Sequence, residues 1–131
     1  MTRIAISTKV APDAIGAYSQ AIKTGEIVYL SGQIGLDPST MELVADTFGK
    51  EIQQVFSNVE SVCRASGGSL SSIVKVSVFL TDMRLFGEVN DVFTNRFTPP
   101  FPARSVVGVN ELPRGARVEI EAVLSIPKEC S

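Results

Sequence analysis

Four short segments place polar side chains in predicted strands or loops, at positions that do not suit a buried core. They are residues 16–21 (GAYSQA), 31–33 (SGQ), 102–105 (PARS) and 119–121 (EIE). Together they offer an arginine, two carboxylates, hydroxyl groups and backbone amides, which suits capture of a small carboxylate and control of a water molecule. The sequence contains no histidine, so the commonest general base near neutral pH and the commonest metal ligand are both absent.

Arg104 and Glu119 are the strongest chemical candidates. Arg104 follows a proline-stiffened segment, and its planar fork of donors suits bidentate capture of a carboxylate. Glu119 and Glu121 share one side of a predicted strand whose other side is apolar. Taken alone, the residues favour plainer explanations, namely a surface arginine paired with any nearby acid and a solvated strand face.

Tyr18 and the Ser31-Gly32 pair are weaker candidates. Tyr18 can donate a hydrogen bond, although a tyrosine at a core margin is more often simply packed. Glycine in mid-strand, as at Gly32, indicates a bulge or the close approach of a ligand or a neighbouring subunit.

Cys63 falls on the apolar stripe of a helix and Cys130 lies near the C-terminus, and neither has a histidine to activate it. No metal-ligand pattern or phosphate-binding glycine loop is present, so we expect no metal site.

The hydrophobic pattern predicts the elements that position these segments. Thr47 or Asp46 caps a helix that ends at Gly67-Gly68, because glycine accepts the left-handed conformation there. A second helix is expected over residues 85–97, before Pro99. Strands are expected at residues 3–7, from about 21, 26–34, 73–81, 104–109 and 117–126. The order β-β-β-α-β-α-β-β predicts an α+β fold with a single mixed sheet and both helices on one face.

The second face of this sheet indicates self-association. Ile27 and Tyr29 oppose Val28 and Leu30 on one strand, and Val106 opposes Val107 on another. A sheet with two apolar faces and one helical layer must bury its second face elsewhere. Contact between copies of the chain is the simplest solution.

Composition bounds the class of protein. We expect one domain over residues 1–131, with 44% hydrophobic and 20% charged residues. A net charge of -2 without a basic run argues against nucleic-acid binding. No apolar run reaches membrane-spanning length and the first residues lack the apolar core of a signal peptide, so no membrane partner is expected. Two cysteines are too few for a disulfide framework, which favours a cytoplasmic location.

The four segments, with others in the same order, resemble the Rid family. This family is also called YjgF/YER057c/UK114 and, in an older name, the L-PSP endoribonucleases. The similarity runs nearly end to end. The similar segments are GAYSQA at 16–21, SGQIGLDPST at 31–40, Asn58, VKVSVFLTDM at 74–83, FGEVNDVF at 86–93, PARSVV at 102–107 and LPRGARVEIEAV at 112–123.

The resemblance implies a chorismate-mutase-like fold and a homotrimer with clefts between subunits. It implies an enzyme, a deaminase that hydrolyses 2-aminoacrylate and related enamine or imine carboxylates to 2-keto acids and ammonia without a cofactor. By position, Arg104 would clamp the substrate carboxylate, and Glu119 would position or activate the attacking water. The remaining site residues would be Tyr18 and Ser31 in the polar wall, Gly32 and Asn90 as shaping residues, and Val106 through its backbone amide.

Two other functions stay open from the sequence. The first is a non-catalytic trimer that binds small carboxylates or acts as a chaperone or regulatory partner, which Arg104 would also serve. The second is the ribonuclease of the older family name, which an acidic chain without histidine or a basic stripe argues against. Glu119 discriminates the first, because a binding protein has no turnover to lose when this residue is changed.

Overall fold

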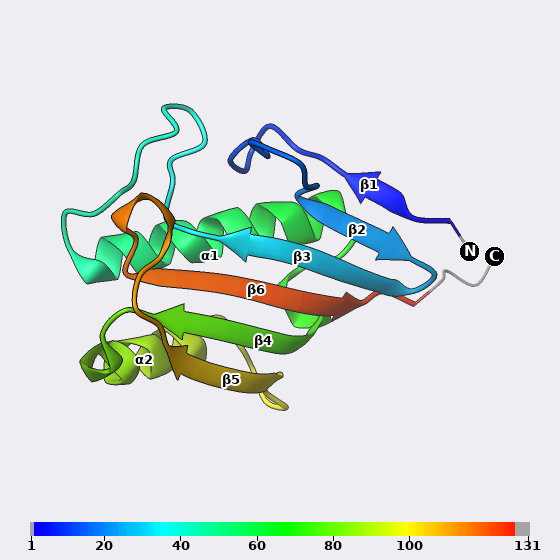
Figure 1. Cartoon of the computed structure of the whole chain (residues 1–131). Helices are drawn as coiled ribbons and strands as arrows, with labels where there is room; N and C mark the ends of the chain where they lie inside the picture. The colour runs from blue at the N-terminus through cyan, green and yellow to red at the C-terminus, as the bar shows by residue number, and fades with distance from the viewer. Residues whose placement is uncertain (1, 128–131) are drawn as a thin grey trace.

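The computed structural model describes residues 2–127, so Cys130 lies outside the described residues. The structure confirms the predicted order of strands and helices. The elements, shown in Figure 1, are β1 (Ile4–Ile6), β2 (Ala21–Thr24), β3 (Ile27–Gln33), α1 (Phe48–Ala65), β4 (Ile73–Leu80), α2 (Phe86–Arg96), β5 (Ala103–Gly108) and β6 (Val118–Ser125). Three short 3-10 turns were not predicted and lie at Leu70–Ser72, Met83–Leu85 and Pro113–Gly115.

The sheet is mixed, as predicted. Its strand order is β1-β2-β3-β6-β4-β5, and every neighbouring pair is antiparallel except β4 and β5, which are parallel. The last strand, β6, therefore lies in the middle of the sheet, between β3 and β4. This position brings the Glu119 segment of β6 beside the Ser31–Gly32 segment of β3.

Both helices cover the same face of the sheet (Figure 1). Helix α1 begins after Thr47, whose Oγ1 accepts a hydrogen bond from the Lys50 amide at 3.1 Å, and Gly67 follows its end with φ +96°. The core joins the apolar stripes of α1 and α2 to alternate residues of the strands. Fully buried members include Ile52, Phe56, Val78, Val118 and Leu124.

The opposite face of the sheet is uncovered within the described chain, but it is less apolar than predicted. Tyr29 and Val107 are 53% and 44% exposed, whereas Val106 packs against the helix-side core. The pairing register places Lys75, Ser77 and Glu121 on the uncovered face as well. The expectation of two apolar faces therefore holds only in part.

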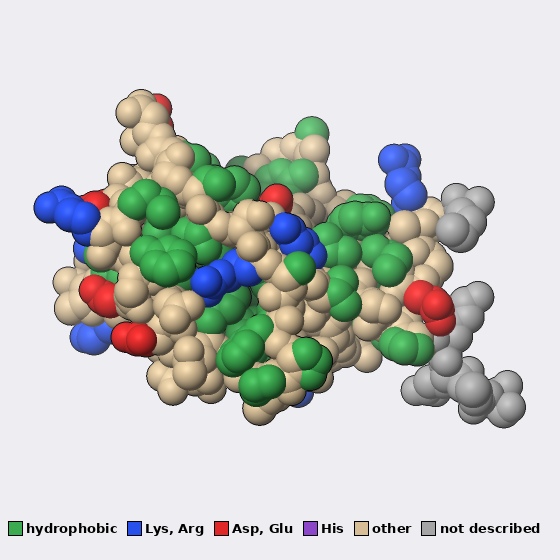
Figure 2. All heavy atoms as spheres, turned by 90° about the horizontal axis from the view of Figure 1, so that it is seen from below, with side chains coloured by type: hydrophobic (Ala, Val, Ile, Leu, Met, Phe, Trp, Pro, Cys, Tyr) green, Lys and Arg blue, Asp and Glu red, His purple; other side chains and the backbone are tan. Residues whose placement is uncertain are grey.

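The β5 edge of the sheet also exposes apolar residues. Figure 2, seen from the side of β5 and α2, shows hydrophobic side chains gathered around basic ones. The exposed apolar residues of this region are Met83, Phe86, Phe101 and Val107.

No helix within residues 2–127 is long and apolar enough to cross a membrane.

Candidate functional site

A cavity of about 280 Å³ lies where β3 and β6 run side by side. Glu119 enters it from β6, Gly32 from β3 and Tyr18 from the loop before β2. The walls come from three connecting segments, and their lining residues are Pro12, Asp13, Ile15, Ile34, Leu36, Met41, Pro113 and Arg114. Three of the sequence-predicted site residues, Tyr18, Gly32 and Glu119, therefore share one cavity.

The Ser31-Gly32 segment forms the predicted bulge, with a register shift between Leu30 and Gln33. Ser31 is held to the segment that precedes β2: its amide donates to the Gln20 carbonyl at 3.0 Å, and its Oγ donates to the Ser19 carbonyl at 2.6 Å. A Cβ at Gly32 would lie 2.8 Å from Cδ and Oε2 of Glu119. The close approach was predicted for a ligand or a neighbouring subunit, and the group that approaches is the chain's own Glu119.

Glu119 is half-buried and has no hydrogen-bond or ion-pair partner among residues 2–127. Its neighbours Val118 and Ile120 belong to the core, so its side chain projects from the uncovered face. Burial raises the pKa of Glu119, and repulsion from Glu121 raises it further. A raised pKa makes the ionised carboxylate a stronger base than that of an ordinary glutamate.

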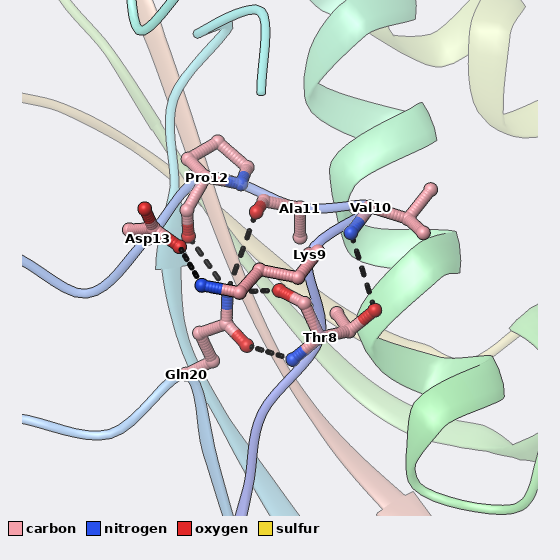
Figure 3. A network of polar contacts seen from close by, with 7 residues as sticks. All are labelled: Thr8, Lys9, Val10, Ala11, Pro12, Asp13 and Gln20. Carbon is pink, nitrogen blue, oxygen red and sulfur yellow. Dashed lines mark hydrogen bonds and ion pairs between the residues drawn. The ribbon is translucent and has the colours of Figure 1, made fainter. Parts of the chain in front are cut away.

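The N-terminal wall of this cavity is held by Gln20, which is 4% exposed. Figure 3 shows its side chain reaching into the loop of residues 8–13. Its Oε1 accepts from the Thr8 amide at 2.7 Å, and its Nε2 donates to the carbonyls of Thr8, Ala11 and Pro12 at 3.1, 3.4 and 2.7 Å. Gln20 lay inside the GAYSQA segment, yet sequence reasoning missed this role because nothing local shows what a buried amide contacts.

Tyr18 lies at the rim of the same cavity. Its side chain is 53% exposed, and its hydroxyl accepts from the Ile15 amide at 3.3 Å. The phenol proton remains available to a bound molecule.

Arg104 lies in a second cavity of about 370 Å³, lined by Asn90, Phe93, Thr94, Phe101 and Pro102. Its guanidinium carbon is 5.4 Å from the ring centre of Phe86 and 4.9 Å from that of Phe93. Its Nη1 donates to Oδ1 of Asn90 at 3.1 Å. Within residues 2–127 Arg104 forms no ion pair, so its cationic head is oriented by α2 but not neutralised.

Arg104 and Glu119 lie on opposite faces of the sheet. Arg104 is registered with Val76, a core residue, and its head stacks on α2, so it faces the helices. Glu119 faces the uncovered side. Asn90 and Val106 lie with Arg104 on the helix side, while Gly32 and Tyr18 lie with Glu119. The described chain thus holds the candidate residues in two separate groups, called half-sites below, and does not bring them together.

Some residues of these half-sites were not predicted. Phe86 and Phe93 fall within the helix predicted over residues 85–97, and Arg114 and Met41 lie outside the predicted helices and strands, so none of the four was named as a site residue. The Pro113–Gly115 turn was the available signal for Arg114, because a charged residue between proline and glycine is held at the surface. Within residues 2–127 there is no cluster of three or more histidine, cysteine, aspartate or glutamate residues that could hold a metal ion.

Comparisons with known proteins find a matching family model, similar sequences and similar solved structures. Residues 8–126 match the family model described as Endoribonuclease L-PSP. A 2-iminobutanoate/2-iminopropanoate deaminase of Dermatophagoides farinae is 50% identical over 121 residues, covering 92% of this chain and 94% of the relative. Solved structures of RidA from an Antarctic Psychrobacter species and of E. coli TdcF with bound serine superpose with TM-scores of 0.91 and 0.87 at 49% and 36% identity. They cover 94% and 95% of this chain, and 99% of each of those chains.

Proposed function

The chain belongs to the Endoribonuclease L-PSP family, also called the Rid family, and from this premise we propose that it is a 2-iminobutanoate/2-iminopropanoate deaminase. Its substrates are enamine and imine carboxylates of the 2-aminoacrylate type, and its products are 2-keto acids and ammonia. The observation that carries the proposal is Arg104, a guanidinium oriented by two rings and one neutral amide, with no ion-pair partner among residues 2–127. Such a group is ready for a substrate carboxylate.

We further propose that the working site forms between two copies of the chain in a homotrimer. Arg104, Asn90 and Val106 of one subunit would meet Glu119, Tyr18 and Gly32 of the next. Two observations support this: the half-sites point to opposite faces of the sheet, and the uncovered face and the β5 edge expose apolar residues. A heterologous contact of this kind, in which each subunit contributes both halves, closes into a three-membered ring when the rotation between neighbouring subunits is one third of a full turn.

The proposed chemistry is addition of water to the imine carbon. Arg104 holds the carboxylate, which fixes the distance from the imine carbon to a water molecule bound at Glu119. The water oxygen bonds to that carbon while Glu119 accepts one of its protons. The electron pair of the C=N π bond moves to nitrogen, which takes this proton from Glu119 to give a carbinolamine. Glu119 then accepts the proton of the new hydroxyl group and passes it to nitrogen, and the carbon–nitrogen bond breaks as the carbonyl forms and ammonia leaves. Gly32 leaves room for the carboxylate of Glu119, and the hydrogen bonds of Ser31 hold the bulge in β3 that provides this room.

The function is tested by generating 2-aminoacrylate with a serine dehydratase and following keto-acid release. Addition of this protein should accelerate release in proportion to its concentration. Release at the rate of the blank, with several amino-acid-derived imines, would leave a trimeric carboxylate-binding protein as the better proposal.

Mixing two inactive variants tests the shared site. Arg104→Ala and Glu119→Gln chains, unfolded together and refolded as one population, should recover activity in about one quarter of the sites if subunits assemble at random. Each recovered site takes its arginine from one chain and its glutamate from another. The same variants refolded separately and then combined serve as the control, and equal inactivity of both samples would show that the site lies within one chain.

The acid limb of the pH profile should report Glu119. This residue must be ionised to accept a proton, and burial raises its pKa, so kcat/KM should fall with decreasing pH above the range of an ordinary glutamate. Glu121→Gln removes the repulsion that raises the pKa further, so its acid limb should shift to lower pH. An acid limb that Glu121→Gln leaves in place would assign the limb to another group.

Gly32→Ala should lower turnover without unfolding the protein. The three atoms nearest to the added Cβ would be Cδ, Oε2 and Cγ of Glu119, all in one flexible side chain that can move aside, so the fold tolerates the change. The displaced carboxylate no longer holds water in line, and kcat/KM should fall about tenfold to a hundredfold. Gly49→Ala is the matched control, since its Cβ would meet only Oγ1 of Thr47 at 3.8 Å. A Gly32→Ala enzyme as active as Gly49→Ala would exclude the need for this space.

The proposal also includes one domain over residues 1–131 and a cytoplasmic location. The buried free thiol of Cys63 supports a reducing compartment. A ribonuclease activity is not part of the proposal, because the chain has no histidine and carries a net charge of -2.

A further inference from the structure

Met41 and Arg114 are the two non-glycine residues within the described part of the chain that have a positive φ, 60° and 62°. They belong to different connections, one before α1 and one before β6, which Figure 1 shows at the same end of the sheet. Nη2 of Arg114 donates to the Met41 carbonyl at 2.9 Å. Both residues line the cavity that contains Glu119. Left-handed backbone at residues with a Cβ is unfavourable, and such strain persists where the surroundings impose a particular geometry.

The segment around Met41 is a closed loop. The Met41 amide donates to the Asp37 carbonyl at 2.7 Å, the Asp37 amide donates to the Glu42 carbonyl at 2.9 Å, and Leu36 pairs with Leu43 at its base. These bonds fix the loop internally. The bond from Arg114 fixes it relative to the turn that leads into β6 and Glu119.

The Met41 side chain packs on a small hydrophobic cluster separate from the main core. Ile34, Leu36 and Ala116 form this cluster, and Met41 covers it together with Leu43 and Leu112. Ile34 and Leu36 also line the Glu119 cavity. Met41 therefore belongs to a continuous apolar wall of the cavity, next to its polar groups.

We propose that Met41, held in place by Arg114, determines the size of the substrate side chain that the site accepts. The inference rests on the proposed function: with the carboxylate at Arg104 and water at Glu119, the remaining substituent of the imine carbon must lie along the apolar wall. The substrates so defined are imines of amino acids with aliphatic side chains. Methionine is unbranched and polarisable, so it adapts to short and medium chains and limits larger ones.

The test compares imines generated in situ by an amino-acid oxidase from alanine, leucine and phenylalanine. Met41→Ala keeps a Cβ at the strained position but removes the part of the apolar wall that the Met41 side chain provides. It should raise the kcat/KM ratio of the phenylalanine-derived to the alanine-derived imine about tenfold or more. Arg114→Gly removes the guanidinium without adding backbone strain and should move the ratio in the same direction by a smaller factor. Arg114→Lys keeps a donor for the Met41 carbonyl and should restore the wild-type ratio.

Arg64→Ala is the control, because Arg64 is an exposed arginine that contacts only Glu60 among charged residues of the described chain. It should leave the ratio unchanged. A Met41→Ala enzyme that loses or gains activity equally on all three imines would overturn the inference while leaving the deaminase function in place. A wild-type protein that hydrolyses none of them would overturn the proposed function, and this inference with it.

Discussion

Arg104→Ala is expected to lower kcat/KM for imine hydrolysis by about a hundredfold or more, with the fold unchanged. The side chain lies at the edge of the sheet, on the rings of Phe86 and Phe93, and its removal empties a cavity that is already open to solvent. What is lost is the anchor of the substrate carboxylate, which holds the imine carbon near the water on Glu119. Keto-acid release from 2-aminoacrylate, measured over a range of substrate concentrations, checks this result.

Arg96→Ala is a matched control for this prediction. Arg96 is the last residue of α2, the helix whose Phe86 and Phe93 contact Arg104. Its guanidinium carbon is 5.6 Å from the ring centre of Phe56, and it donates to the side-chain oxygen of Gln53. It therefore has the same kind of ring contact and neutral partner as Arg104 but lies outside the Arg104 cavity. Arg96→Ala should retain wild-type kcat/KM. Equal losses in the two variants would mean that arginine–aromatic packing, and not carboxylate binding, explains the effect.

Arg104→Lys separates charge from geometry. Lysine keeps the positive charge but cannot form two parallel hydrogen bonds to a carboxylate or stack as a plane on two rings. We expect an intermediate activity, with KM raised more than kcat is lowered. Activity equal to the wild type would show that charge alone suffices.

The elements of this fold were predictable because local patterns specify them. The stripe from Phe48 to Cys63 repeats at helical spacing, Thr47 and Gly67 provide the ends, and the strands alternate or are bounded by turn residues. The three 3-10 turns were missed because single turns carry too little periodicity. The mixed sheet followed from the element order, since each helix joins two parallel strands.

The site was predictable only as a set of residues. The sequence could indicate Arg104 and Glu119, but their separation onto opposite faces depends on the register of β5 and β6 against β4, which no local pattern encodes. The same limit applies to Gln20 and Asn58. Each is a buried amide whose side-chain nitrogen donates to backbone carbonyls at least eight residues away, such as Pro12 for Gln20 and Leu36 for Asn58.

Glu51 is the largest departure from the sequence-based view of α1, and it carries the largest expected effect on stability. It is 0% exposed in the first turn of the helix, and the sequence pattern did not predict a buried acidic residue there. Its Oε2 accepts from the Arg117 amide and its Oε1 from Nε of Arg117, both at 2.7 Å. Arg117 also donates to the Ala45 carbonyl at 3.1 Å. The carboxylate thus joins α1 to the start of β6 through both backbone and side chain.

Glu51→Ala should lower the free energy of unfolding by about 3 kcal/mol, because it leaves the Arg117 amide and guanidinium without their acceptor. The value lies at the lower end for a broken buried pair, since the Arg117 side chain is 38% exposed and can reach water. Arg117→Ala should cost at least as much, because the carboxylate left behind has no access to water. Urea unfolding at equal protomer concentration measures both. Asp46→Ala, which breaks the exposed pair with Lys50, should cost less than about 1 kcal/mol.

The same variants test whether stability and activity are coupled through β6. Glu119 lies two residues beyond Arg117, so the Glu51–Arg117 pair fixes the end of the strand that presents the proposed base. Glu51→Gln keeps an acceptor for the Arg117 amide and should retain more stability and more turnover than Glu51→Ala. If Glu51→Ala instead loses stability but keeps full kcat/KM at low temperature, the position of Glu119 depends on its neighbours in the sheet and not on the buried ion pair.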